Sequence, residues 1–373
     1  MHAMSFDTST LREGCERAFN IAAALPAQGS IYDQQDVHGL SDARDHGLSV
    51  AVCTVTGERW SWSTPGDPSN PSFLLQSTFK PLMLAMALNV ADVGAERVWP
   101  VVGHENGGVA FSTLEMLQGE RQRAWNPLIN SGALVVLELL TRDDQRDERT
   151  LIAFIRALAR AGGATEDGVR ALSLDKKAAV QTLMDSQRNA AIAHNLAAHG
   201  VLPRSAGGEP EAVRRAVRMY ALMDCVTCDV RSLAAVGAVL ANGGRAISGT
   251  AAAEAAKHTR GTAAEADVKT APAALLTPAA VRGTLSAMMT SGMYQSAGEW
   301  AARVGLPAKS GVSGNILAIS PGRLAIAVYS PRIDSAGNSV RGQAFFAALV
   351  QELPELSLFF APTSTAQTRD ARL

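Results

Sequence analysis

A serine and a lysine stand three residues apart at Ser77 and Lys80, and the apolar stretch 82–88 follows them. On a helix this spacing places both side chains on one face. A serine hydroxyl is a weak nucleophile at neutral pH, but a desolvated, neutral lysine amine can take its proton. At the first turn of a helix, backbone amides would also lie beside the serine where an oxyanion forms. The pair therefore predicts nucleophilic attack by Ser77 with Lys80 as its base.

The surrounding sequence separates this pair from a chance occurrence of the spacing. The same spacing recurs at Ser173 and Lys176 without comparable context, and a lone pair of this kind is typical of a surface coincidence. Lys309, however, opens a Lys-Ser-Gly run later in the chain. Serine enzymes of the penicillin-recognising type combine S-x-x-K on a helix with K-[ST]-G on a strand that lines the site. Both elements occur here in that order.

Length and composition describe a globular protein. The chain has 373 residues, of which 47% are hydrophobic and 18% charged, enough for one large domain or two closely packed ones. Its net charge of -1 gives no electrostatic reason to expect nucleic acid or an anionic membrane surface as a partner. The N-terminus lacks the pattern of a signal peptide, and no apolar run reaches membrane-spanning length. We therefore expect a cytoplasmic protein.

The cysteines and histidines form no metal-binding pattern. Cys225 and Cys228 have the spacing of metal ligands, but neither a second pair nor matching histidines accompany them. The four cysteines are also too scattered for a disulfide framework. We expect reduced thiols, no metal and no cofactor.

Strands are predicted near both ends of the chain. Alternating and β-branched residues over 46–55 and 58–63 predict a β-hairpin, and strands return at 316–319 and 324–329. Helices are predicted between and around these strands from apolar positions at three- and four-residue spacing. They cover 11–25, 127–140, 150–161, 176–199, 211–223, 229–241 and 340–353.

The order of these elements predicts an α/β fold with a mixed antiparallel sheet flanked by helices. The sheet-containing domain would be built from residues 11–76 and 294–355, with a mainly helical domain over 77–293 inserted between them. Residues 250–278 are interpreted as a loop insertion and 362–373 as a disordered tail. Ser77 would then lie at the seam between the domains, where pockets tend to form.

Seven ordered blocks of sequence resemble a known family. They are residues 76–81, 126–133, 188–189, 240–244, 291–294, 304–312 and 337–342. In these blocks the chain resembles the serine-dependent glutaminases, which share the fold of serine β-lactamases and penicillin-binding proteins. The resemblance spans most of residues 45–350 and implies a β-lactamase-like fold. It also implies hydrolysis of a small-molecule carboxamide, first of all L-glutamine to L-glutamate and ammonia, through an acyl-enzyme. We expect a homodimer or homotetramer.

The same resemblance assigns roles to individual residues. Ser77 would be the nucleophile, Lys80 its base and Tyr294 a proton shuttle, and the backbone amides of Ser77 and Val312 would form the oxyanion hole. The expected substrate-binding residues are Asn130, Asn189, Tyr220, Tyr294, Val312 and Lys309, with Tyr220 also a catalytic candidate. Simpler interpretations stay open. The asparagines could be helix caps or buried amides, Tyr220 a core residue, and Lys309 the partner of a carboxylate.

Two positions depart from the family's pattern. The family's Tyr-Ile-Pro segment near the N-terminus is absent, and Tyr32 is out of register with its tyrosine. Thr182 stands where the family has a glutamate, which would be expected to pair with the α-ammonium of the substrate. Asp185 and Asp224 are carboxylates that could substitute for it, and each could instead be an ordinary charge on a helix surface.

Two alternative functions are also compatible with the sequence. A β-lactam- or peptide-directed acyl-transfer enzyme would be labelled covalently by a penicillin, but the missing signal peptide argues against it. A non-catalytic binding protein with this fold would turn over no amide at all, and the retained Ser77, Lys80, Tyr294 and Lys309 argue against that.

Overall fold

The structure is a computed structural model that describes residues 7–32, 47–66, 69–120, 122–202, 208–247, 249 and 274–360. The predicted tail over 362–373, and all of the predicted loop insertion except residues 274–278, lie outside the described residues.

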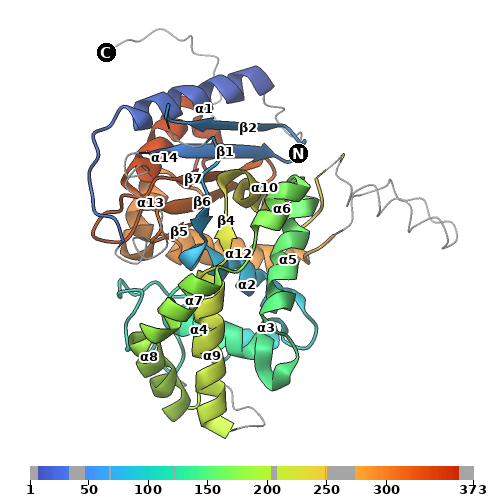
Figure 1. The fold of residues 1–373 in the computed structure, drawn as a ribbon, viewed down its shortest axis with the longest axis vertical. Helices are drawn as coiled ribbons and strands as arrows, with labels where there is room; N and C mark the ends of the chain where they lie inside the picture. Colours follow the sequence, from blue (N-terminus) through green and yellow to red (C-terminus); the bar gives the residue numbers. More distant parts are fainter. Residues whose placement is uncertain are drawn as a thin grey trace, which may run out of the picture.

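A five-stranded antiparallel sheet joins the two ends of the chain, as predicted (Figure 1). Its strand order is β2-β1-β7-β6-β5, and every neighbouring pair is antiparallel. The strands are β1 (Ser49–Thr54), β2 (Arg59–Ser63), β5 (Ala308–Gly311), β6 (Asn315–Ser320) and β7 (Leu324–Tyr329). The predicted hairpin is confirmed as β1 and β2, and the later strands extend the predicted ones by at most a residue at each end.

Both faces of this sheet are buried, each against a different core. Side chains alternate along a strand, so Val50 and Val52 join one cluster of buried residues while Ala51 and Cys53 join the other. The first cluster includes helices α1 (Thr8–Ala23), α13 (Ala297–Arg303) and α14 (Val340–Glu352). On the other face α10 (Val230–Ala241) packs across β1, β6 and β7. Helices therefore flank the sheet on both sides (Figure 1).

Most of the other helices gather beyond one edge of the sheet, in the lower half of Figure 1. They belong to the range predicted to be mainly helical, yet α10 of the same range covers the sheet, so the division into two domains stays a prediction. These helices are α2 (Phe79–Asn89), α3 (Gly94–Val98), α4 (Asn130–Thr141), α5 (Glu148–Ala161), α6 (Glu166–Ala171), α7 (Lys176–Met184), α8 (Gln187–Ala198), α9 (Gly208–Asp224) and α12 (Pro278–Ser291). Short 3-10 turns lie at η3 (Gln76–Thr78), η4 (Arg142–Asp144), η5 (Tyr294–Ser296) and η6 (Pro354–Leu356). Among the described helices, none is both long enough and apolar enough to cross a bilayer.

The prediction of one helix over 176–199 is wrong, because the chain forms α7 and α8 with a break at Asp185 and Ser186. The Ser186 hydroxyl donates a hydrogen bond of 2.6 Å to the carbonyl oxygen of Thr182. A side chain that bonds a nearby carbonyl competes with the helical backbone bond to the same acceptor. Both α7 and α8 pack against α9, and the break separates these two contacts.

A two-stranded sheet fixes the segment that precedes Ser77. It pairs β3 (Phe73–Leu74) with β4 (Thr227–Cys228), which follows α9 directly. The amide of Leu75 then donates to the carbonyl of Val226 at 2.8 Å. The start of the turn that carries Ser77 is thus tied to the end of α9.

Candidate active site

Ser77 lies in η3, a turn whose conformation is fixed by hydrogen bonds to the residues before it. Gln76 before it has φ +46, which is uncommon for a residue other than glycine and persists only where the surroundings impose it. Side chains that follow β5 supply this constraint. Ser313 donates to the carbonyl of Leu74 at 2.8 Å, and Asn315 donates to the carbonyl of Leu75 at 3.2 Å. The serine is therefore presented at a fixed position at the start of α2.

Lys80 follows on the first turn of α2 and is almost completely buried. Its Nζ donates a hydrogen bond of 2.8 Å to Oδ1 of Asn130, the first residue of α4. The hydroxyl of Tyr220, on α9, donates to the same oxygen at 2.8 Å. Nδ2 of Asn130 in turn donates to Oδ1 of Asn189, on α8, at 2.9 Å. Four helices thus bring these predicted site residues into one hydrogen-bonded network.

The structure shows how two members of this network are held, while their roles toward the substrate stay a prediction. Among the described residues, the side chain of Asn130 caps no helix and bonds to the side chains of the network alone. The ring of Tyr220 does pack in the core, edge-on against Phe79, but its hydroxyl is directed into the network.

The burial of Lys80 has a chemical consequence. Burial lowers the pKa of Lys80 to about 7, while the negative charge of Asp224 acts in the opposite direction. Within the described part of the chain, Lys80 forms no ion pair with a carboxylate. A large fraction of Lys80 is therefore neutral near pH 7, as a general base requires.

Tyr294 and Lys309 form a second group next to the serine. Tyr294 has φ +53, and its hydroxyl donates to the carbonyl of Ser310 at 2.8 Å. Burial raises the pKa of Tyr294, and the interaction of its phenol with the Ser77 hydroxyl acts against that rise. Nζ of Lys309 lies 4.0 Å from the centre of the Tyr294 ring and donates to the carbonyls of Gly292 and Ser310. Lys309 thus packs against the ring of Tyr294 and helps to fix its position.

Ser77 opens into a cavity of about 290 Å³. Of the residues predicted to act at the site, Ser77, Asn130, Asn189, Tyr220 and Val312 line it. Lys80 and Tyr294 do not line the cavity, but Lys80 contacts Asn130 and Tyr294 contacts Ser77. Lys309 is fully buried and does not line it either. The remaining lining residues are Tyr32, Gln76, Phe111, Ser112, Thr182, Asp185, Ser186, Arg188 and Asp224.

Several of these lining residues were not predicted from the sequence. Tyr32, although out of register in the sequence, lines the cavity and packs with Tyr294 and Val312. Phe111 contacts Tyr294 with ring centres 5.2 Å apart, and it comes from a segment without regular structure. Arg188 also lines the cavity. Its position directly before Asn189, in one of the seven blocks, is the sequence signal that could have identified it.

Two residues that line the cavity, Ser77 and Val312, bring backbone amides to it. In the described residues, neither the Ser77 nor the Val312 amide donates a hydrogen bond to another group. Val312 directly follows β5, which packs against η3. Gly311 allows this approach, because a Cβ at that position would lie 2.9 Å from the carbonyl oxygen of Leu75. The two free amides are thus available to an oxyanion.

The cavity wall contains Thr182, which stands where the family has a glutamate, and the two carboxylates that could replace that glutamate, Asp185 and Asp224. The hydroxyl of Thr182 lies 3.2 Å from Sγ of Cys225. Asp185 is exposed and accepts a hydrogen bond of 2.8 Å from Gln181. Asp224 is 8% exposed, so the prediction that it could be a surface charge is wrong. Burial raises the pKa of Asp224 to about 7, against the opposing effect of the charges of Lys80 and Lys309.

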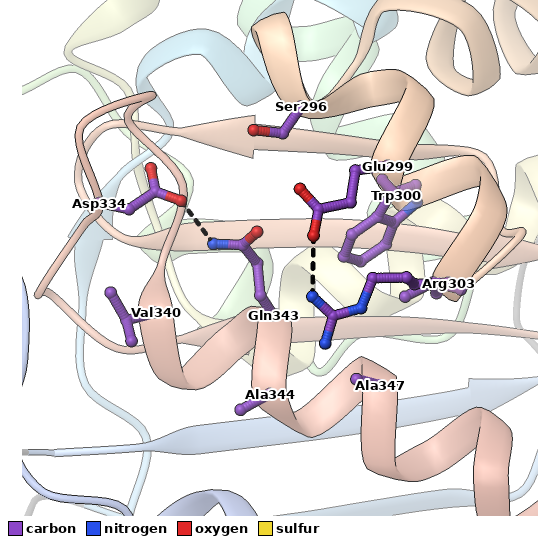
Figure 2. A pocket seen from close by; sticks show the side chains of 10 residues that line it. Ser296, Glu299, Trp300, Arg303, Asp334, Val340, Gln343, Ala344 and Ala347 are labelled. Atoms are coloured by element: carbon purple, nitrogen blue, oxygen red, sulfur yellow. Dashed lines mark hydrogen bonds and ion pairs between the residues drawn. The ribbon is translucent and has the colours of Figure 1, made fainter.

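A second cavity of about 280 Å³ lies between α13 and α14 (Figure 2). Its charged groups are already paired, since Glu299 accepts from Arg303 at 2.9 Å and Asp334 accepts from Gln343 at 2.8 Å. It contains no serine and lysine arrangement like that of Ser77. The cavity at Ser77 is the candidate active site because its wall carries the serine that stands one turn before the buried Lys80.

Metal ligation has no support in the part of the chain that the structure describes. No group of three or more histidine, cysteine, aspartate or glutamate side chains is arranged there to hold an ion. All four cysteines are buried and free.

Comparison with known proteins identifies the family of this chain. The glutaminase family profile matches residues 34–265 and 251–359. A glutaminase of Yersinia pestis is 33% identical over 88% of this chain and 92% of its own length. A glutaminase of Corynebacterium efficiens is 34% identical over 86% of this chain, which spans only 66% of that relative. Among solved structures, the probable glutaminase ybaS superposes with a TM-score of 0.75 at 26% identity, covering 94% of this chain and 98% of its own. The chain therefore belongs to the serine-dependent glutaminase family.

Proposed function

We propose that this protein hydrolyses the side-chain carboxamide of L-glutamine, giving L-glutamate and ammonia, through an acyl-enzyme on Ser77. The supporting observation is a serine in the wall of a cavity, one helical turn before a buried lysine whose pKa is lowered to about 7. Membership of the glutaminase family points to the same substrate. The arrangement also supports a β-lactamase-like fold, with K-S-G on a strand next to the serine turn.

In the first half of the reaction, Oγ of Ser77 attacks the carboxamide carbon while its proton passes to neutral Lys80. The amides of Ser77 and Val312 stabilise the oxyanion of the tetrahedral intermediate. The C–N bond then breaks, and the leaving nitrogen takes a proton to depart as ammonia. Tyr294, next to the Ser77 hydroxyl, is placed to deliver that proton and to recover one from the ammonium of Lys80.

In the second half, water attacks the Ser77 ester. Lys80, neutral again, accepts a proton from that water, and the same two amides stabilise the second oxyanion. The ester C–O bond breaks, Ser77 regains its proton, and the carboxylic acid leaves as carboxylate. Water, Ser77, Lys80 and Tyr294 together account for every bond and proton in this scheme.

Ammonia release by the purified protein tests the proposal. Replacing Ser77 by alanine should abolish release from L-glutamine, whereas Ser173→Ala should not, although Ser173 belongs to the chain's other S-x-x-K sequence. The hydroxyl of Ser173 contacts Thr227 at 3.1 Å, away from the cavity, which makes it a matched control. Equal rates for wild type and Ser77→Ala would refute the nucleophile. No release from any amide by wild type would favour a non-catalytic protein.

A further inference from the structure

Asp224 is the buried carboxylate of the candidate active site. It is the last residue of α9, one turn after Tyr220, and it lines the cavity. Its Oδ1 is inaccessible to solvent and has no hydrogen-bond partner among the described residues. A carboxylate in this position is unfavourable unless a cation or a hydrogen-bond donor compensates it.

The two lysines whose charges act on Asp224 do not fill this role. Both Lys80 and Lys309 influence the charge of Asp224, but neither forms an ion pair with it in the described structure. Lys80 directs its amine to Asn130, and Lys309 directs its amine to two backbone carbonyls. Asp224 is thus left without a cationic partner in the described structure, and a positively charged group of a bound substrate would favour its ionised form.

Neighbouring groups of the cavity wall cannot replace Asp224 as an anion. Thr182 has no charge, and its hydroxyl is directed at Cys225, the residue after Asp224. Asp185 is exposed to solvent and already bonded to Gln181, so it lacks the burial that makes an ion pair strong. The only buried carboxylate in the described lining is therefore Asp224.

The same cavity also offers a positive charge. Arg188 lines it, and its Nε donates to the carbonyl of Ser112 at 2.9 Å, which holds the guanidinium at the wall. A wall with one unpaired anion and one cation is complementary to a small molecule that carries both an ammonium and a carboxylate group. The side-chain carboxamide of the same molecule could then reach Ser77.

We propose that Asp224 binds the α-ammonium group of the substrate and so makes the enzyme selective for amides that carry one. This inference rests on the proposed function, amide hydrolysis at Ser77. Asp224 is here a specificity-determining residue, and its contribution is made in binding rather than in bond making or breaking.

The test compares L-glutamine with glutaramate, which has the same carboxamide but no α-amino group. In Asp224→Asn, a change that keeps the shape of the side chain, the ratio of kcat/KM for glutamine to that for glutaramate should fall about tenfold or more. The matched control is Asp185→Asn, which removes the exposed carboxylate of the same wall and should alter the ratio by about twofold at most.

A binding experiment separates this inference from the proposed function, because it needs no turnover. In the Ser77→Ala background, calorimetry should show that Asp224→Asn weakens L-glutamine about tenfold or more and leaves glutaramate nearly unchanged. Equal losses for the two ligands would overturn the assignment of Asp224, even in an active enzyme. A selective loss in Asp185→Asn instead would also overturn it. Selective binding without any ammonia release by wild type would support Asp224 and refute the hydrolysis.

Discussion

The strongest quantitative prediction concerns the pH at which Lys80 becomes a base. Burial disfavours the charged form of Lys80 and lowers its pKa to about 7, and Asp224 opposes this effect. The neutral fraction of Lys80 therefore increases across neutral pH, from the smaller part below pH 7 to the larger part above it. Since only the neutral amine accepts the proton of Ser77, kcat/KM should rise roughly tenfold per pH unit below 7 and level off above it.

Substitutions at Lys80 test whether this group sets the profile. Lys80→Met keeps the length of the side chain and should lower kcat by about 10²–10⁴-fold, the range for losing a general base. Its residual activity should lose the rise near pH 7. Lys80→Arg keeps a positive charge but stays protonated at every working pH, so it should be as impaired as Lys80→Met.

Asp224→Asn tests in which direction the Asp224 carboxylate shifts the pKa of Lys80. The carboxylate raises the pKa of Lys80, so its removal should move the rise in activity to lower pH. Glutaramate is the substrate for this measurement, because its binding does not require an ionised Asp224. The measurement is ammonia release from pH 5.5 to 9. A flat profile between pH 6 and 8, or Lys80→Arg with near wild-type activity, would refute the assignment of Lys80 as the base.

Two further substitutions test the groups around the serine. Tyr294→Phe removes the hydroxyl next to Ser77 and keeps the ring over Lys309, so kcat should fall about 10²-fold or more while the unfolding midpoint changes little; a kcat within about threefold of wild type would remove Tyr294 from proton transfer. Gly311→Ala places a Cβ 2.9 Å from the carbonyl oxygen of Leu75 and should push β5 away from the serine turn. It should lower kcat by about 10²-fold, as expected when an oxyanion donor is displaced, with KM less affected. Unchanged kinetics in a folded Gly311→Ala protein would argue against Val312 as that donor.

The sheet and the serine–lysine pair were predictable because their signals are local. Alternation of apolar residues marks a strand within a few positions, which is why the hairpin and the strands at 316–319 and 324–329 were found. The spacing of Ser77 and Lys80 places the two side chains on one face once the segment forms helical turns. The break in the helix over 176–199 was missed, since it depends on whether the hydroxyl of Ser186 turns back to Thr182.

Asp224 shows why the electrostatics of the site could not be predicted in the same way. In the sequence it is one of 35 acidic residues, at a spacing from Tyr220 that a surface charge would share. Its burial depends on how α9 packs against helices such as α7, and its pKa also responds to the lysines of α2 and β5, which come from distant parts of the chain. The pKa of Lys80 depends on the same packing, because a lysine shifts only when its surroundings exclude water. Residue types and spacing therefore identify which groups can react. Their protonation states before substrate binds depend on the packing of the folded chain.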